Sequence, residues 1–148
     1  MINIRKAEKQ DIPVMAAIEE ESSENPWNAA QLLEELEFSD FAYLIVAETE
    51  GEVVGFCSMH IASGDAHINE LTVARKYQRL GAGTALVEHC IRLAKDSCES
   101  VTLEVRGCNV SARELYLSCG FKNIGERKDF YTNPSDDAIV MEYEISGE

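Results

Sequence analysis

Two closely spaced glycines, Gly81 and Gly83, stand between a strand-like segment and an apolar pattern of helical period. Because neither residue carries a Cβ atom, backbone N–H groups can gather around one point there. A helix that begins at this point adds the partial positive charge of its N-terminus. Such a turn can bind a phosphate group, although it lacks the Lys-Ser/Thr pair of a P-loop and the full spacing of a dinucleotide fingerprint. The alternative is a structural turn without a ligand.

A second candidate for chemistry is Glu104, which lies within a predicted strand from Val101 to Val105. In a strand, Leu103 shares one face with the two valines, whereas Thr102 and Glu104 share the other face. A carboxylate in a central strand costs free energy unless water or a partner stabilises it. We therefore expect Glu104 either in a cleft near the glycine turn or at an exposed position.

Two aromatic residues have both a structural and a functional interpretation. Trp27 precedes the predicted start of a helix, where it can form a hydrophobic staple with Leu32. Tyr116 lies on the apolar stripe of a later helix, where a tyrosine commonly belongs to the core. The three histidines are isolated in the sequence, and none of the five cysteines has a recognisable base partner. The cysteine spacing predicts neither a disulfide framework nor a zinc site.

Strands and helices mix along the chain in a pattern typical of an α/β domain. Strands are predicted at residues 2–5, 42–48, 53–61, 66–73, 101–105, 121–126 and 138–145. Helices are predicted at residues 12–21, from 28 onward, 82–96 and 110–119, with Asp11 and Asn109 as N-caps of the first and last. Short links predict antiparallel pairs among the second, third and fourth strands, whereas a crossover helix makes strands 66–73 and 101–105 parallel.

Length and charge limit the kind of protein. The 148 residues and a hydrophobic fraction of 45% fit one soluble domain, 1–148, with its own core. The net charge of −14 argues against nucleic acid as a direct partner. It can attract basic partners or simply keep the chain soluble. Without a signal segment or an apolar run of membrane-spanning length, a cytoplasmic protein that does not contact the membrane is expected.

The segment Gln78-Arg79-Leu80-Gly81-Ala82-Gly83 matches the Gln/Arg-x-x-Gly-x-Gly/Ala motif of the GNAT superfamily of N-acetyltransferases. The run from Leu103 to Asn109, with Leu115-Tyr116 and Gly120-Phe121 after it, resembles the second signature of the ribosomal-protein-alanine (RimI-type) branch. Pro26-Trp27 and the run from Asp137 to Met141 are also similar to that branch. The resemblance therefore covers nearly the whole chain.

This resemblance implies the GNAT fold, a twisted and mostly antiparallel sheet of about seven strands with a splayed parallel pair, flanked by about four helices. It also implies acetyl-CoA as the acetyl donor, without a metal. Backbone groups of Leu71, Thr72 and Val73 would bind the pantetheine arm, and Asn109 would contact the cofactor near its thiol. The residues that would hold the pyrophosphate are Arg79, Leu80, Gly81, Ala82, Gly83 and Thr84.

The same resemblance implies roles on the acceptor side. Glu104 would act as general base and Tyr116 as general acid. Glu70 is a rival base that could instead order water or bind the amine. Trp27 and Tyr131 would line a peptide groove, although Thr132 and Asn133 interrupt the Tyr-Tyr-Pro run that is frequent in the family.

The expected reaction is acetyl transfer to the N-terminal α-amine of a protein, by resemblance the alanine of a small-subunit ribosomal protein. An α-amine has a pKa of about 7.7–8.0 against about 10.4 for lysine, so its neutral form is easier to generate near neutral pH. The alternatives are a lysine or small-molecule amine as acceptor, and a non-catalytic acyl-CoA-binding module. A monomer or weak dimer is expected, with a basic ribosomal protein as partner of the acidic chain.

Overall fold

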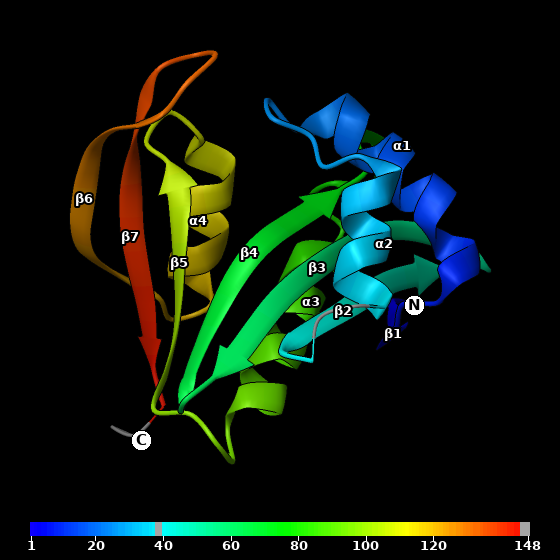
Figure 1. Ribbon diagram of the computed structural model, residues 1–148, viewed down its shortest axis with the longest axis horizontal. Coiled ribbons are helices and arrows are strands. Elements are labelled where there is room, and N and C mark those ends of the chain that lie inside the picture. The colour runs from blue at the N-terminus through cyan, green and yellow to red at the C-terminus, as the bar shows by residue number, and fades with distance from the viewer. Residues whose placement is uncertain (38–39, 146–148) are drawn as a thin grey trace.

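A seven-stranded sheet in the order β1-β2-β3-β4-β5-β7-β6 organises the computed structural model, which describes residues 1–37 and 40–145 (Figure 1). Its strands are β1 (Asn3–Lys6), β2 (Ala42–Thr49), β3 (Glu52–Ala62), β4 (Asp65–Val73), β5 (Ser100–Arg106), β6 (Lys122–Tyr131) and β7 (Asp136–Glu144). The neighbours β4 and β5 are parallel, and the other neighbouring pairs are antiparallel. The predicted mixed, mostly antiparallel sheet with a central parallel pair is therefore confirmed.

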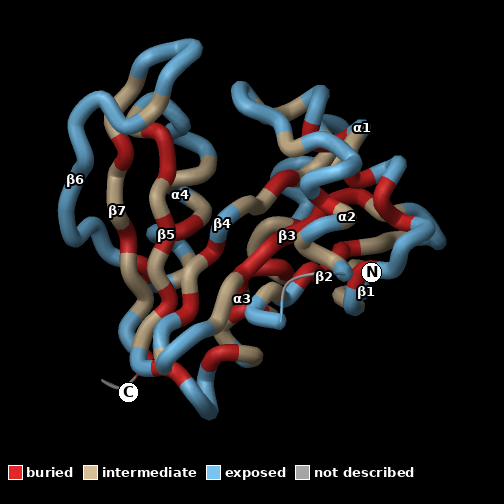
Figure 2. The backbone as a smooth tube through the Cα atoms, viewed as in Figure 1, coloured by how far each residue is buried: buried red, intermediate tan, exposed pale blue. Residues whose placement is uncertain are grey.

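Helices cover both faces of this sheet. They are α1 (Ile12–Ser22), α2 (Ala29–Glu37), α3 (Ala82–Ala94) and α4 (Val110–Ser118), with short 3-10 turns η1 (Lys9–Asp11) and η2 (Arg75–Tyr77). Leu44 and Phe56 pack in one core with α1 and α2, whereas Ile45 and Cys57 pack in a second core with α3. The middle parts of β2 and β3, residues 44–47 and 54–59, are accordingly buried on both faces (Figure 2). No helix of the described residues is long and apolar enough to cross a membrane.

The start of α2 follows the sequence prediction closely. Asn28 Oδ1 accepts a hydrogen bond from the backbone N–H of Gln31 at 2.9 Å, and Gln31 Oε1 accepts one from the N–H of Asn28 at 2.9 Å. This capping box fixes where the α1–α2 loop ends. Trp27 packs on the core cluster that contains Leu32, as expected for a hydrophobic staple.

Two local predictions differ from the structure. Asp11 does not cap α1 with its side chain, because its carboxylate binds the guanidinium of Arg5 at 2.9 Å and the backbone N–H of Glu8 at 2.7 Å. Strand β6 extends to Tyr131 instead of ending near Glu126. It is an exposed edge strand with an irregular register against β7, so its outer half lacks the alternation that marks a half-buried strand.

The parallel pair separates halfway along its length (Figure 1). The register between β4 and β5 ends at Ile68 and Leu103, although β4 continues to Val73. At the same level the register between β3 and β4 shifts by one residue, which leaves Asn69 as the extra residue of a β-bulge. Because a bulge bends its strand and increases the local twist, it directs the end of β4 away from β5.

Candidate active site

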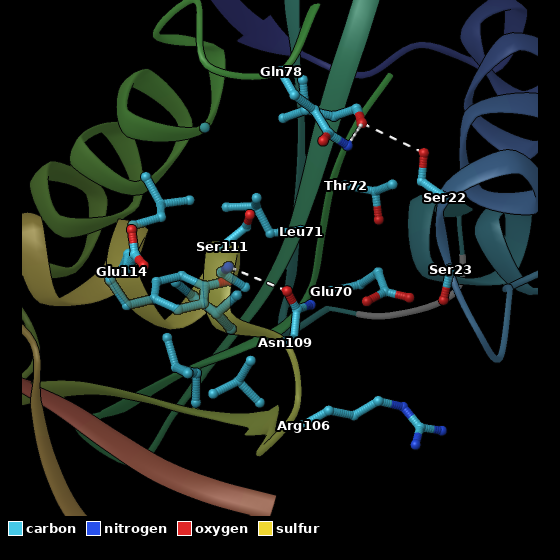
Figure 3. A pocket seen from close by; sticks show the side chains of 18 of the residues that line it. Ser22, Ser23, Glu70, Leu71, Thr72, Gln78, Arg106, Asn109, Ser111 and Glu114 are labelled. Carbon is cyan, nitrogen blue, oxygen red and sulfur yellow. Dashed lines mark hydrogen bonds between the residues drawn. The ribbon is translucent and has the colours of Figure 1, made fainter. Parts of the chain in front are cut away.

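The diverging strands β4 and β5 form the walls of a cleft of about 1160 Å³ (Figure 3). The α1–α2 loop and the first turn of α3 line it beside β4, and α4 and Tyr131 line it beside β5. The predicted site residues among its walls are Trp27, Glu70, Leu71, Thr72, Val73, Arg79, Gly81, Gly83, Thr84, Glu104, Asn109, Tyr116 and Tyr131. Leu80 and Ala82 are not among them: Leu80 is exposed, and Ala82, the first residue of α3, is buried in the core.

The first turn of α3 presents backbone donors to the cleft. Gly81 is the N-cap in the left-handed region, with a φ of 96°, and no side chain caps this end of the helix. The first N–H groups of a helix have no acceptor within the helix, so those after Gly81 remain available to an anion. An added Cβ at Gly83 would meet Leu115 Cδ2 at 3.0 Å, so a side chain there makes Leu115 move, and a bulky one pushes α3 away from α4.

Leu71, Thr72 and Val73 lie beyond the point where β4 stops pairing with β5. Their backbone edge therefore faces the cleft, where an extended ligand arm can pair with it. Asn109 also lines the cleft, but its Oδ1 accepts a hydrogen bond from the N–H of Ala112 at 3.2 Å and caps α4 (Figure 3). Its predicted capping role is therefore confirmed.

Glu104 lies in the cleft wall rather than at an exposed position. Its Oε2 atom is buried and lies 2.9 Å from Arg127 Nε in an ion pair, without a hydrogen bond between the two groups. Its Oε1 atom lies 3.7 Å from His67 Nε2. The carboxylate thus has charged and polar neighbours while it keeps lone pairs for another partner.

His67, which is isolated in the sequence, has partners from a neighbouring strand in the fold. Its Nδ1 atom lies 2.8 Å from Thr102 Oγ1, and burial lowers the pKa of its ring below the usual value, against the opposing effect of Glu104. The imidazole is therefore neutral near neutral pH. His60 also has a partner, since its Nε2 atom lies 2.7 Å from Glu35 Oε1.

Glu70 forms a pair with a second carboxyl group that the sequence reasoning missed. Burial, followed by a hydrogen bond with Glu19, raises the pKa of Glu70 to about 10. Glu19 is fully buried, and it accepts hydrogen bonds from Thr72 Oγ1 at 2.6 Å and from the Trp27 N–H at 3.0 Å. Glu70 therefore holds its proton next to a second buried carboxyl group. One sequence signal could have predicted that Glu19 is buried: it lies four residues after Met15 and therefore on the same, buried side of α1.

Tyr116 belongs to the core and also lines the cleft, the two positions between which the sequence did not decide. Its ring packs against Phe121 with the ring centroids 5.6 Å apart, and the residue also lines the cleft. Burial raises the pKa of its phenol well above the usual value, so the hydroxyl remains protonated. Within the described residues no group hydrogen-bonds to this hydroxyl, which leaves its proton available.

The cleft therefore combines an anion-binding helix start, a carboxylate and a protonated phenol. Such groups can hold a phosphate-bearing donor, accept a proton from a nucleophile and supply one to a leaving group. Among the described residues, no three His, Cys, Asp or Glu side chains are grouped as a metal site requires.

Comparisons with known proteins agree with this geometry. The model of the acetyltransferase (GNAT) family matches residues 12–121. The [ribosomal protein bS18]-alanine N-acetyltransferase of Escherichia coli (strain K12) is 32% identical over 150 residues, which cover 99% of each chain. An N-alpha-acetyltransferase of Sulfurisphaera tokodaii is 34% identical over 114 residues, which cover 68% of each chain.

Comparison with solved structures gives a similar result. The crystal structure of the ribosomal-protein-S18-alanine N-acetyltransferase from Escherichia coli superimposes with a TM-score of 0.88 and 29% identity, and the match covers 99% of this chain and 95% of that one. The family match, the relatives and the splayed sheet lead to one assignment. The chain belongs to the GNAT family of acetyltransferases.

Proposed function

We propose that this chain transfers an acetyl group from acetyl-CoA to the N-terminal α-amine of a protein. The observation that carries the proposal is the cleft between β4 and β5, which places an anion-binding helix start and the Glu104 carboxylate around one space. The related N-alpha-acetyltransferases support the reaction class.

The donor side fits a phosphate-bearing group. The glycine N-cap leaves the first N–H groups of α3 free, and Gly83 keeps the approach to α4 open. Backbone N–H groups of residues 81–84, with Arg79 beside them, would hold the pyrophosphate. The backbone edge of Leu71 to Val73, which does not pair with β5, would hold the pantetheine arm. Leu80 and Ala82 would contribute only backbone groups. When bound, acetyl-CoA supplies the acetyl thioester and a thiolate leaving group.

Gly83→Val is expected to weaken acetyl-CoA binding about tenfold or more. A branched side chain collides with Leu115 and displaces the first turn of α3, where each lost charge-assisted hydrogen bond costs ~1.5–3 kcal/mol. Isothermal titration with CoA measures the effect. Gly125→Val is the control, since a Cβ there meets no atom within 4 Å and the residue lies on the distant strand β6. Unchanged CoA affinity in Gly83→Val would contradict this binding mode.

The acceptor side needs a base, an oxyanion donor and an acid. Glu104 takes a proton from the amine, directly or through a water molecule. The backbone N–H of Val73 is the proposed donor to the thioester oxygen. Tyr116 donates its phenolic proton to the leaving thiolate. Trp27 and Tyr131, from opposite sides of the cleft, would line the path of the peptide.

Glu70 is the weaker candidate for the base. A carboxyl group with a pKa of about 10 holds its proton at neutral pH and cannot accept a second one from the amine. Glu70→Gln keeps a hydrogen-bond donor of the same shape beside Glu19. We therefore expect kcat within about threefold of the parent, a small loss next to the 10²–10⁴ of a general base. A loss of about 10²-fold would identify Glu70 as the base instead.

The same substitution has an expected effect on stability. With a folded pKa raised above the unfolded value of about 4.3, Glu70 retains a proton that the unfolded chain has released. The free energy of unfolding should therefore fall as the pH rises from about 4.3 to about 10. Glu70→Gln should reduce this slope, as urea denaturation at several pH values measures. An identical slope in both proteins would mean that Glu70 is not protonated in the folded state.

Two peptides test the acceptor class. One begins with alanine and contains no lysine, and the other has a blocked N-terminus and one internal lysine. With acetyl-CoA, only the first is expected to gain an acetyl group, measured by mass. Modification of the second would favour lysine acetylation, and tight acetyl-CoA binding without transfer to any amine would favour the binding module.

The natural acceptor is proposed to be the N-terminal alanine of a small-subunit ribosomal protein. The Escherichia coli relative, named for that reaction on bS18, supports this choice, and so does the net charge of −14, which favours a basic partner. A lysine acceptor is the alternative that the second peptide tests, whereas an enzyme for a small-molecule amine would leave both peptides unmodified.

A further inference from the structure

Arg106 is a buried cation at the end of β5 that no step of the proposed reaction uses; it is only 8% exposed. Its Nη1 donates to the carbonyl oxygen of Pro134 at 2.8 Å, and its Nη2 donates to that of Thr132 at 3.3 Å and to Asn25 Oδ1. Its guanidinium carbon lies 4.4 Å from the ring centroid of Tyr131. A guanidinium suits this position because it combines a rigid fork of donors with a face that stacks on an aromatic ring.

These partners lie on opposite sides of the cleft. Thr132 and Pro134 belong to the loop between β6 and β7, on the side of β5, whereas Asn25 belongs to the α1–α2 loop on the side of β4. In Figure 3 the side chain of Arg106 extends away from β5 toward the side where Ser23 begins that loop. We call β4 with the α1–α2 loop one arm of the molecule and β5 with the β6–β7 loop the other arm. Arg106 and Asn25 therefore connect the two arms across the space that β4 and β5 leave open.

The α1–α2 loop carries Trp27 only two residues after Asn25. The loop is attached to its own arm by the hydrogen bond from the Trp27 N–H to Glu19 and by the packing of Trp27, and through Asn25 it is also attached to the opposite arm. Arg106 likewise stacks on Tyr131. Both aromatic residues of the proposed peptide path are thus held through the same guanidinium.

We propose that Arg106 and Asn25 form a latch across the cleft that positions Trp27 and Tyr131 for the acceptor peptide. This role rests on the proposed function for the identity of the acceptor. Arg106 is a positioning residue, since it acts through Asn25 and Tyr131 and not on the reacting atoms. The latch lowers the conformational entropy lost when the peptide binds, because both walls are ordered beforehand.

The first test uses the free protein, so it does not depend on any acceptor. Trp27 is the single tryptophan of the chain, and acrylamide quenching of its fluorescence reports how accessible the loop is. Asn25→Ala and Arg106→Lys should each raise the quenching constant about twofold, because the loop opens locally without its second attachment. Asn28→Ser is the matched control in the same loop: it keeps an N-cap residue and does not contact Arg106.

The second test separates positioning from catalysis. In Asn25→Ala and Arg106→Lys the KM for an alanine-initiated peptide should rise about tenfold, which corresponds to about 1.4 kcal/mol of binding free energy. The kcat and the KM for acetyl-CoA should stay within about twofold, because Glu104 and the start of α3 are untouched. The double variant should be no worse than the more impaired single variant, as expected for two residues of one contact.

Unchanged quenching in Asn25→Ala would overturn the latch, and Asn25 is an exposed loop residue whose substitution is compatible with folding. Increased quenching with an unchanged peptide KM would overturn its role in positioning the acceptor. If the parent transfers no acetyl group to the peptide, the proposed function fails, whereas the quenching experiment still decides whether the latch exists.

Discussion

Glu104→Gln lowers kcat for acetyl transfer by about 10²- to 10⁴-fold, the range that a positioned general base contributes. Glutamine has the shape of the carboxylate but cannot take the proton of the amine. The parent carboxylate forms an ion pair with Arg127 at 2.9 Å, so it is already oriented in the free protein. The affinity for acetyl-CoA should not change, because Glu104 is not among the groups proposed to hold the donor.

The loss in Glu104→Gln should be larger at pH 6.5 than at pH 9. An α-amine with a pKa of about 7.7–8.0 is mostly neutral at the higher pH and then needs less help from a base. Steady-state rates across this range measure the effect. The control is Glu142→Gln, which removes a carboxylate from β7 opposite Thr102 and does not line the cleft. A Glu104→Gln enzyme with the rate and pH profile of the parent would exclude Glu104 as the base.

Tyr116→Phe is expected to lower kcat by about 10²-fold or more, through loss of the proton for the leaving thiolate. The packing should survive, because phenylalanine keeps the ring contact with Phe121 and the hydroxyl has no hydrogen-bond partner among the described residues. Thermal denaturation should therefore show a melting temperature near that of the parent, while the rate falls.

The control for this substitution comes from the same aromatic cluster. Tyr143 contacts Phe121 with the ring centroids 5.7 Å apart, but it does not line the cleft. Tyr143→Phe should keep kcat within about twofold, well below the 10² of an acid–base group. Equal losses in both variants would indicate a packing effect and argue against Tyr116 as the acid.

The fold could be predicted largely because its signals are local. The apolar segments 42–48 and 53–61, the glycine turn and the Asn28–Gln31 capping box each involve neighbours in sequence. The predicted end of β6, near Glu126, was wrong because the residues that follow are exposed, so no hydrophobic pattern marks them as part of a strand. The parallel pairing of β4 and β5 was predicted from the crossover helix, but their splaying came from family resemblance, since the bulge at Asn69 has no signal of its own.

The parts of the site that sequence reasoning missed are contacts between distant segments. Glu19 meets Thr72, His67 meets Glu104, and Arg106 meets Asn25 across the cleft. A glutamate, histidine or arginine looks the same in sequence whether its partner is water or a buried group. Only the folded arrangement decides which titratable groups are buried together and how their pKa values change.

The most direct test of the account uses a conjugate in which CoA is joined through an acetyl linker to the α-amine of an alanine-initiated peptide. It spans the donor and acceptor sides of the cleft at once. Isothermal titration should give a dissociation constant about 10²-fold or more below that of CoA, as expected for a ligand that resembles the transition state. Joining the same CoA to the lysine of an N-terminally blocked peptide should remove most of this gain. An α-amine conjugate that binds no more tightly than CoA alone would contradict the account.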